Sequence, residues 1–490
     1  MPGEKTPKFT LTLPLRVSPE QHSVLVKSQQ ASRKIYNAVL GESLKRLSEM
    51  RRDKRWQQAG QMAKGKDRNT AYQNLREYYG FTKSSLEVYA KHLRNRSYIK
   101  DHIGSTINQA TCLRAFTAVE DYLYGERGRP RFKGFNRLNS LQAKSNKVGI
   151  VFDGKTVKYN TYLHKLVLPV RYDGRSSELD YVYEALERKI SYCRLVHRRI
   201  KGKNRWYVQL ILDGLPPIKD KHKALFRRAN GKIVGLDTGP SNIAIVGLER
   251  GQQAYIRFAE KVEYQWRVVK RLQRKLDRSR RASNPDNYDD TGWIRSGHKV
   301  WKHSRRYYRL LDQYREMERI LSAMRFTSHG ELANTILSIG NEVYTENVSY
   351  KAWQKMFGRS SKVRGSGMFQ DRLIRKAENA GGKVYLINTY RTRLSQYCHI
   401  RNDYIKKPLS QRCHVFPDGK TVQRDLYSAF LATCVVNNDT LDTDRVLCTW
   451  QAVDSCLSNH VSTQAELVMN VSSSKKRLDC ESCSSETISD

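Results

Sequence analysis

Long apolar runs are missing from this chain of 490 residues. No stretch approaches the roughly 20 consecutive apolar residues that a membrane-spanning helix needs, so we expect no spanning segment. The N-terminus, Met1-Pro-Gly-Glu-Lys5, has no apolar core of the kind found in secretory signals, which argues against export. Nine cysteines scattered over the whole length do not form the dense framework of a secreted scaffold. These absences predict a protein of the reducing cytoplasm.

Negative charge is also scarce. The chain has 48 Asp and Glu against 89 Lys and Arg, which gives a formal net charge of +41. An excess of this size is typical of proteins that bind polyphosphates, although it says nothing about the fold. With a membrane-spanning role excluded, the composition predicts nucleic acid as the partner.

The N-terminal half changes character near residue 125. Alternating apolar residues over 9–17 predict a strand, and Ser18-Pro-Glu-Gln21 predicts the start of a helix. The chain then has helical character to about residue 124. After a stretch rich in Gly and Pro (125–134), the residues to about 214 are typical of strands and suggest a small β-barrel.

A second pattern begins at residue 231. Two apolar runs, 233–237 and 243–247, predict paired strands, and helical spacing follows over 262–276 and 307–324. A strand near Val343, a helix near 368–380 and a strand over 383–387 come next. This order is compatible with an RNase H-like α/β core that carries a helical insertion. The predicted fold class is therefore α+β and multidomain.

Three acidic residues stand at the edges of elements in this second region. Asp237 ends the first strand, Glu346 ends the stretch 341–346, and Asp425 opens a helical stretch. Carboxylates so placed can converge on one site, and oxygen ligands are those that Mg²⁺ prefers. Two such ions hold the attacking and the leaving oxygen of a phosphodiester. In a chain this basic, the spacing predicts a nuclease.

Each of these acidic residues has a simpler interpretation when taken alone. Asp237 can be an ordinary turn residue, and Glu346 can be a solvated strand end. Asp425 can be a first-turn residue that the helix dipole favours. Their joint order, the α/β pattern around them and the basic surroundings favour the metal-binding interpretation.

Two stretches carry dense positive charge. A charged helix face is often only solvated, but 267–281 contains too few acids to neutralise its Arg and Lys, which favours contacts with phosphates. Most tyrosines are expected in the core, and none is singled out as a base-stacking residue. The residues that we predict to bind nucleic acid are Arg127, Arg129, Arg131 and Lys133 in the first stretch, and Arg271, Arg274, Lys275 and Arg278 in the second.

In combination, these motifs resemble the transposon-encoded TnpB nucleases and the compact type V CRISPR effectors related to them. Gly-Leu-Asp237-Thr-Gly239, Tyr-Thr-Glu346-Asn347 and Gln-Arg-Asp425-Leu426 stand where that family has its three RuvC motifs. The stretches 128–133 and 271–280 also match, and the resemblance covers about residues 8–433. It implies a guide RNA, two Mg²⁺ ions and double-stranded target DNA with a short flanking motif. It also implies a prokaryotic protein of the cytoplasm, associated with the nucleoid when bound.

The resemblance further implies a division into domains. The expected domains are a first wedge strand (1–19), a helical recognition domain (20–125), a wedge β-barrel (126–225), the first part of a RuvC core with its helical insertion (226–390), a degenerate zinc-ribbon-like segment that binds target nucleic acid (391–424), the final RuvC helix (425–436) and a poorly ordered tail (437–490). The tail is rich in Ser, Thr, Asn and Asp.

The zinc-ribbon-like segment departs from the family pattern. Relatives carry two pairs of cysteines there, whereas this chain has Cys398 and Cys413 with Arg401 and Phe416 at the second position of each pair. A structural zinc site needs four N or S ligands in a tetrahedron, and adjacent Cys-His pairs seldom provide one. We therefore expect a ribbon held by ordinary packing, with no zinc bound.

The preferred hypothesis is an RNA-guided DNA endonuclease with catalytic and metal-binding residues Asp237, Glu346 and Asp425. One alternative is an RNA-guided DNA-binding protein that cuts weakly or not at all and serves in regulation or transposition targeting. A second alternative is a guide-free, structure-selective RuvC nuclease. The intact acidic triad argues against the first, and the long N-terminal region argues against the second.

Overall fold

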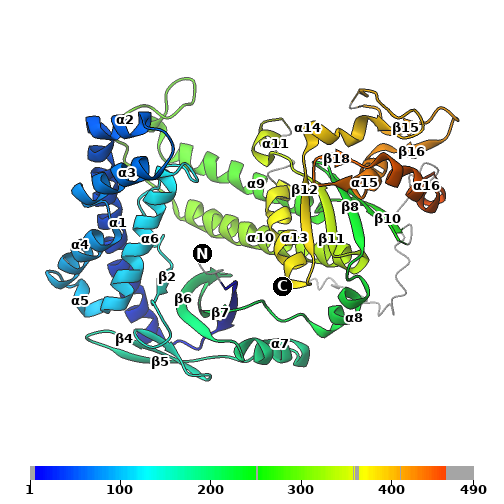
Figure 1. Cartoon of the computed structure of the whole chain (residues 1–490). Helices are drawn as coiled ribbons and strands as arrows, with labels where there is room; N and C mark the ends of the chain where they lie inside the picture. The colour runs from blue at the N-terminus through cyan, green and yellow to red at the C-terminus, as the bar shows by residue number, and fades with distance from the viewer. Residues whose placement is uncertain (1–5, 250–251, 357, 359–362, 409, 459–490) are drawn as a thin grey trace. The chain divides into compact units, whose positions relative to one another are not determined.

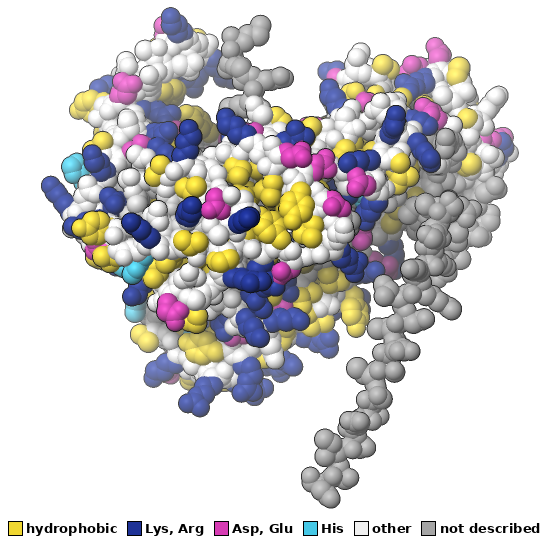
Figure 2. Space-filling model, turned by 90° about the horizontal axis from the view of Figure 1, so that it is seen from below, with side chains coloured by type: hydrophobic (Ala, Val, Ile, Leu, Met, Phe, Trp, Pro, Cys, Tyr) yellow, Lys and Arg dark blue, Asp and Glu magenta, His cyan; other side chains and the backbone are white. Residues whose placement is uncertain are grey.

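The computed structural model describes residues 6–249, 252–356, 358, 363–408 and 410–458. The chain is a mixed α/β protein that divides into two compact units, Met1–Lys219 and Asp220–Asp490 (Figure 1). Each unit has a buried apolar core of its own. Among the described residues, no helix has the length and apolar character needed to cross a bilayer. Lys and Arg side chains are spread over the face drawn in Figure 2.

Helices dominate the first part of unit 1. The long helix α1 (Pro19–Arg52) starts at a capping box in which Ser18 N donates to Gln21 Oε1 at 3.0 Å and Gln21 N donates to Ser18 Oγ at 3.2 Å. This confirms the helix start predicted from the sequence. The remaining helices are α2 (Lys54–Gln61), α3 (Lys66–Tyr78), α4 (Lys83–Asn95), α5 (Ile99–His102) and α6 (Ser105–Leu123).

Strands from both ends of unit 1 form one sheet. Strand β1 (Lys8–Pro14) pairs antiparallel with β7 (Lys203–Asp213), and β7 forms a hairpin with β6 (Ile190–Ile200). Strand β2 (Ser140–Gln142) pairs with the other edge of β6. A second sheet contains β3 (Ile150–Phe152), β4 (Thr156–Asn160) and β5 (Lys165–Pro169). Helix α7 (Ser176–Leu186) interrupts a region for which the sequence indicated only strands. Its short amphipathic pattern lay between strong strand signals, so it was missed.

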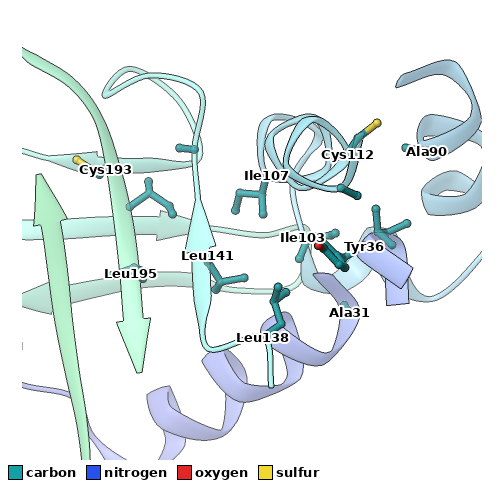
Figure 3. Close-up of a cluster of buried hydrophobic side chains, with 14 of the residues drawn as sticks. Ala31, Tyr36, Ala90, Ile103, Ile107, Cys112, Leu138, Leu141, Cys193 and Leu195 are labelled. Atoms are coloured by element: carbon teal, nitrogen blue, oxygen red, sulfur yellow. The ribbon is translucent and has the colours of Figure 1, made fainter. Parts of the chain in front are cut away.

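The core of unit 1 joins its helices to its sheets. Figure 3 shows Leu138 and Leu141 close to Ala31 and Tyr36 of α1 and to Ile107 of α6. Leu138 and Leu141 are almost fully buried, so the chain just before and within β2 is fixed to the helices by apolar packing.

Unit 2 is built on a five-stranded sheet in the order β10-β9-β8-β11-β12. Strands β8 (Ile233–Thr238), β9 (Asn242–Gly247) and β10 (Gln252–Arg257) are antiparallel neighbours. Strands β8, β11 (Glu342–Glu346) and β12 (Lys383–Ile387) are parallel. The pairing of the runs 233–237 and 243–247 is confirmed, whereas β10 was not anticipated because its residues are mostly polar.

Two long helices lie between β10 and β11 in the sequence. Helix α9 (Glu260–Ala282) runs beside α10 (Arg305–Ile339), as Figure 1 shows, and Gln273 Nε2 donates to Tyr314 OH at 3.2 Å between them. This confirms the two helices predicted over 262–276 and 307–324. The described residues of unit 2 before β12 also form α8 (Asp220–Arg228), α11 (Tyr350–Met356) and α13 (Ser366–Asn379), and a short 3₁₀ turn covers Pro285–Asn287.

After β12 the chain forms small hairpins and two further helices. These elements are α14 (Thr389–Thr392), a 3₁₀ turn (Leu394–Gln396), β13 (Tyr397–Cys398), β14 (Asp403–Tyr404), β15 (Cys413–Val415), β16 (Thr421–Gln423), α15 (Arg424–Ala432), β17 (Val435–Val436), β18 (Thr440–Leu441) and α16 (Thr443–Ser458). Helix α15 packs on β8 and β9.

The prediction of a poorly ordered tail over 437–490 is wrong for residues 440–458. Helix α16 contacts α15 and β10, and it buries Val446, Val453 and Leu457. The polar composition of the whole stretch concealed these apolar residues, which recur at helical spacing. The rest of the predicted tail, 459–490, lies outside the described residues.

Candidate active site

Asp237 and Glu346 stand at the carboxyl ends of neighbouring parallel strands. In the register between β8 and β11, Leu236 lies opposite Thr345, so the next residue on each strand is one of the two acids. Alternation along a strand sends successive side chains to opposite faces, so residues in the same register position share a face. The sheet therefore places both carboxylates side by side, and both are partly buried.

The third acid reaches this edge on a helix. Asp425 lies in the first turn of α15, which approaches β8 unusually closely because residue 235 is a glycine. A Cβ atom added to Gly235 would meet the carbonyl oxygen of Ala429 at 1.9 Å, so no other residue fits there without moving the helix. The sequence contained this glycine, but only the packing reveals its purpose. Because Gly235 has no side chain, α15 lies close to the sheet, and this fixes the distance of Asp425 from the strands.

The pKa of Asp237 depends on burial and on the charges of the other two acids. Burial raises the pKa of the Asp237 carboxyl well above its ordinary value, and the negative charges of Glu346 and Asp425 raise it further. The positive charge of Arg424 opposes this effect. Burial also raises the pKa of Glu346. A cluster of carboxylates that disfavour one another's charge is a place where a cation is stabilising.

Hydrogen bonds hold Asp425 in place. Tyr255 of β10 donates its hydroxyl to Asp425 Oδ2 at 3.2 Å, and Asn242 Nδ2 donates to the same hydroxyl oxygen at 2.8 Å. The guanidinium of Arg424 lies 3.4 Å from Asp425 Oδ1. Tyr255 and Asn242 were not singled out from the sequence. Their only signal was an isolated Tyr in a polar stretch whose pairing with β9 could not be foreseen.

The carboxylate cluster (Asp237, Glu346 and Asp425) offers the type of ligand atom that a hard divalent cation prefers. All are carboxylate oxygens, and a hydrogen bond from the buried Ser428 hydroxyl acts to lower the pKa of Asp237 against the larger effects that raise it. In the part of the chain that the structure describes, however, no group of three or more His, Cys, Asp or Glu is arranged to hold a metal ion.

Comparisons with known proteins give similarity to solved structures alone. No family model matches this sequence, and no curated protein does. The solved structures that it resembles include a Cas12f1–sgRNA–target DNA complex, at 13% identity and a TM-score of 0.45, with 88% of this chain and 99% of the other chain covered. A second is a CRISPR-Cas12f ternary complex, at 13% identity and a TM-score of 0.25, with 89% and 100% covered. Similarity this low leaves the function to be argued from the residues themselves.

The two candidate zinc residues lie on separate small hairpins. Cys398 ends β13 and is buried, while Cys413 opens β15 and is partly exposed. Arg401, at the position of a missing cysteine, is exposed. Phe416, at the other such position, is only 2% exposed. Arg401 therefore lies in solvent, whereas Phe416 is part of the apolar core of unit 2.

An aromatic cluster surrounds Phe416. Its ring centre lies 4.5 Å from that of His414, 5.1 Å from His399, and 5.3 Å from both Tyr427 and Trp450. His399 Nδ1 and Tyr427 OH are 2.8 Å apart, which ties β13 to α15. Burial, with a smaller effect of Lys407, lowers the pKa of His414 to about 3, so this imidazole is neutral. The hairpins thus dock onto α15 through packing of neutral rings.

The four predicted nucleic-acid-binding residues of unit 1 lie on an irregular stretch between α6 and β2, called here the basic segment (residues 125–137). Arg127 is exposed and pairs with Asp121 at 3.3 Å. Arg129 and Arg131 are exposed and form no ion pair among the described residues, whereas Lys133 is half-buried with its ammonium 5.5 Å from the centre of the Tyr36 ring. Two of the four therefore present unneutralised charge to solvent.

The four predicted residues of unit 2 all lie on one helix. Arg271, Arg274, Lys275 and Arg278 are exposed on α9, and none forms an ion pair within the described part of the chain. Arg274 and Arg278, together with Gln273 and Asp277, line an open groove of about 640 Å³. Asp277 is engaged by Arg280 and Arg281 at 2.6 and 2.8 Å. The groove therefore keeps a positive lining.

Proposed function

We propose that this chain is an RNA-guided DNA endonuclease in which Asp237, Glu346 and Asp425 form a RuvC-type active site. The observation that carries the proposal is the carboxylate cluster. Two acids stand side by side at the ends of parallel strands, a third is brought over them by a helix, and their charges raise the pKa of Asp237. A protein gains nothing in stability from such a cluster, which favours a catalytic purpose.

The sheet order supports an RNase H-like interpretation of unit 2. Three antiparallel strands are followed by two parallel ones, and the long helices α9 and α10 enter between β10 and β11. This arrangement agrees with the core and helical insertion expected from the motifs. In such a core the carboxylates would hold Mg²⁺, and bound Mg²⁺ would supply positive charge to stabilise a phosphodiester undergoing hydrolysis.

The three acids and the residues that contact them have different roles in the proposed site. Asp237 and Glu346 would present their oxygens from the rigid sheet edge, where neither backbone can shift without disturbing the strand pairing. Tyr255 orients Asp425 through its hydroxyl, because that hydrogen bond fixes one carboxylate oxygen and leaves the other toward Arg424. Arg424 places its guanidinium beside the other carboxylate oxygen of Asp425, at 3.4 Å.

The proposed partners are a guide RNA and a double-stranded DNA target. The net charge of +41 favours a polyanionic partner, and exposed Arg and Lys side chains without an ion pair occur among the described residues of both units. The motif order over residues 8–433 resembles that of TnpB-like and compact type V nucleases. In proteins of that kind, base pairing with the guide supplies sequence specificity.

A second candidate function is guided DNA binding with little or no cleavage. It is favoured by one observation, namely that the described residues include no His, Cys, Asp or Glu group arranged to hold a metal ion. The guided nuclease remains the stronger proposal, since two acids share one end of neighbouring strands and the charge of the third acts on Asp237.

The test starts from RNA that copurifies with the protein. That RNA is sequenced, and the ribonucleoprotein is offered duplex DNA that carries the complementary sequence beside a randomised flank, with Mg²⁺ present. We expect cleavage of the matched duplex and none of a scrambled duplex. Cleavage at normal efficiency after RNA removal would overturn the guided proposal. Tight matched binding without cleavage would establish the second candidate in its place.

A further inference from the structure

The basic segment is held to helix α1 by its backbone. Asn37 Nδ2 donates to the carbonyl oxygen of Lys133 at 2.9 Å, and Lys133 N donates to Asn37 Oδ1 at 2.8 Å. Arg33 Nη1 donates to the same carbonyl at 3.3 Å, and Gln30 Nε2 donates to Asn136 Oδ1 at 2.7 Å. The Asn37 side chain thus makes with the Lys133 backbone the pair of hydrogen bonds that a neighbouring β-strand would make. A stretch without regular structure is given a fixed position.

This fixed stretch presents two phenylalanines to solvent. Phe132 is 60% exposed and Phe135 is 72% exposed. Phe135 is the second residue of a turn over 134–137, which a hydrogen bond from Arg137 N to the Gly134 oxygen closes at 3.1 Å. The third residue, Asn136, has a left-handed backbone with φ 56°. The turn directs Phe135 outward, while Phe132 rests near Gly41 of α1, whose added Cβ would lie 3.6 Å from the ring.

Single exposed apolar side chains are common and need no explanation. These two differ because both occupy a clamped segment within four residues of each other, although burying either would have been favourable. The chain also buries its neighbour Leu138 to 3% exposure, so an apolar core was within reach. The geometry therefore favours a role for the two rings outside the core.

The surrounding charge defines what these rings can meet. Residues 127–152 contain seven Lys or Arg and no Asp or Glu. The exposed Arg129 and Arg131 precede Phe132, and the guanidinium carbon of Arg33 lies 6.0 Å from the centre of the Phe135 ring. The apolar surface of a partner protein would gain little binding energy from contact with these cations. Phosphates with unpaired bases match both features, since bases stack on aromatic rings while cations hold the backbone.

We propose that Phe132 and Phe135 form a stacking platform for unpaired bases of RNA, with Arg129 and Arg131 on the adjoining phosphates. This inference rests on the proposed function, which supplies the RNA. RNA is favoured over DNA because RNA exposes splayed bases in loops and bulges before any target is bound, whereas DNA bases become unpaired only after the guide has opened the duplex. The platform is preorganised, because Asn37 fixes the backbone that carries both rings.

The experiment measures RNA affinity of the full chain and its variants. The probe is an RNA hairpin with 2-aminopurine in an unpaired loop, compared with the same sequence closed into a blunt duplex and with the DNA form of the hairpin. The variants are Phe132→Ala, Phe135→Ala, the double variant and Phe135→Trp. Tyr162→Ala, which removes an aromatic ring 81% exposed elsewhere in unit 1, is the matched control.

We expect each alanine variant to bind the RNA hairpin roughly tenfold more weakly, with the loss of 2-aminopurine quenching. Phe135→Trp should retain affinity, and Tyr162→Ala should match the wild type. Binding of the blunt duplex should not change. The dependence of affinity on salt should also be unchanged in the phenylalanine variants, whereas replacing Arg129 and Arg131 should flatten it, because only cations release counterions.

The outcomes separate this inference from the proposed function. If the wild type fails to bind RNA, both are overturned. If the wild type binds RNA and the double phenylalanine variant binds as tightly, the platform alone is wrong. A loss equal for hairpin and duplex would assign the rings to folding, which thermal melting of the variants would show. A loss confined to the DNA hairpin would overturn RNA as the occupant.

Discussion

The carboxylate cluster and the basic segment use opposite designs. The cluster places three carboxylates in partly buried positions on strands and a helix, and burial raises the pKa values of Asp237 and Glu346. The basic segment places its free charges in solvent on irregular backbone, which hydrogen bonds from α1 help to fix. Chemistry on a phosphodiester needs oxygens held within narrow limits, which regular structure provides. Phosphate binding needs exposed charge, which a clamped loop supplies at less cost in stability.

The largest expected effect would come from breaking the cluster. Changing Asp237, Glu346 or Asp425 to Ala should each reduce cleavage of the matched duplex by at least about a thousandfold, because each removes an oxygen that would position the stabilising charge. Guided binding of the DNA should remain within a few fold of wild type. Cleavage kinetics and gel-shift affinities of the four proteins, measured under one set of conditions, provide the check. Normal cleavage by any variant would place the active site elsewhere.

An intermediate effect should follow from neutralising the basic segment. Replacing Arg127, Arg129, Arg131 and Lys133 together with Ala should weaken RNA binding by roughly tenfold to a hundredfold at moderate salt, and the slope of affinity against salt should fall. The fold should survive, because Leu138 and the Asn37 hydrogen bonds to backbone atoms are untouched. Filter binding across a salt series measures this. A matched control changes four basic residues of α3 and α4 to Ala, namely the exposed Lys66, Lys83 and Lys91 and the half-buried Arg68.

Equal loss in both quadruple variants would show that the basic segment acts only through net charge. No loss in either would show that it is an ordinary solvated loop. Loss in the basic segment alone is the result that we expect, since its charges are fixed in position.

The smallest effect concerns stability and follows from the raised pKa of Asp237. The folded protein keeps a proton on this carboxyl that the unfolded chain releases above its ordinary pKa near 4. The free energy of unfolding therefore falls as the pH rises above about 4 toward the folded pKa. Asp237→Asn removes this loss, so the variant should melt roughly 3 °C higher than wild type near neutral pH, the shift that about 1 kcal/mol produces in a unit of this size.

Thermal melting over a pH series measures this prediction. The difference between Asp237→Asn and wild type should shrink toward pH 4, where both carry a neutral side chain. Added Mg²⁺ should raise the melting temperature of wild type more than that of the variant, because the cation offsets the repulsion that the variant lacks. A variant that melts below wild type at every pH would contradict the charge-repulsion account of the cluster.

The sequence by itself determined the strong local patterns. The capping box at Ser18, the paired strands 233–237 and 243–247 and the spacing of α9 and α10 depend on neighbouring residues, so they were predicted correctly. Their signals combine residue type with a period that only one element satisfies. The charge excess likewise follows from composition alone.

Only the tertiary structure decided how distant segments meet. It placed Asp237 level with Glu346 through a strand register spanning more than a hundred residues, brought α15 onto Gly235, and recruited Tyr255 from a strand that the sequence did not reveal. It also built α16 where composition indicated a disordered tail. Register and close approach depend on the packing of the whole sheet, and no local pattern encodes which residue of one segment will lie opposite which residue of another.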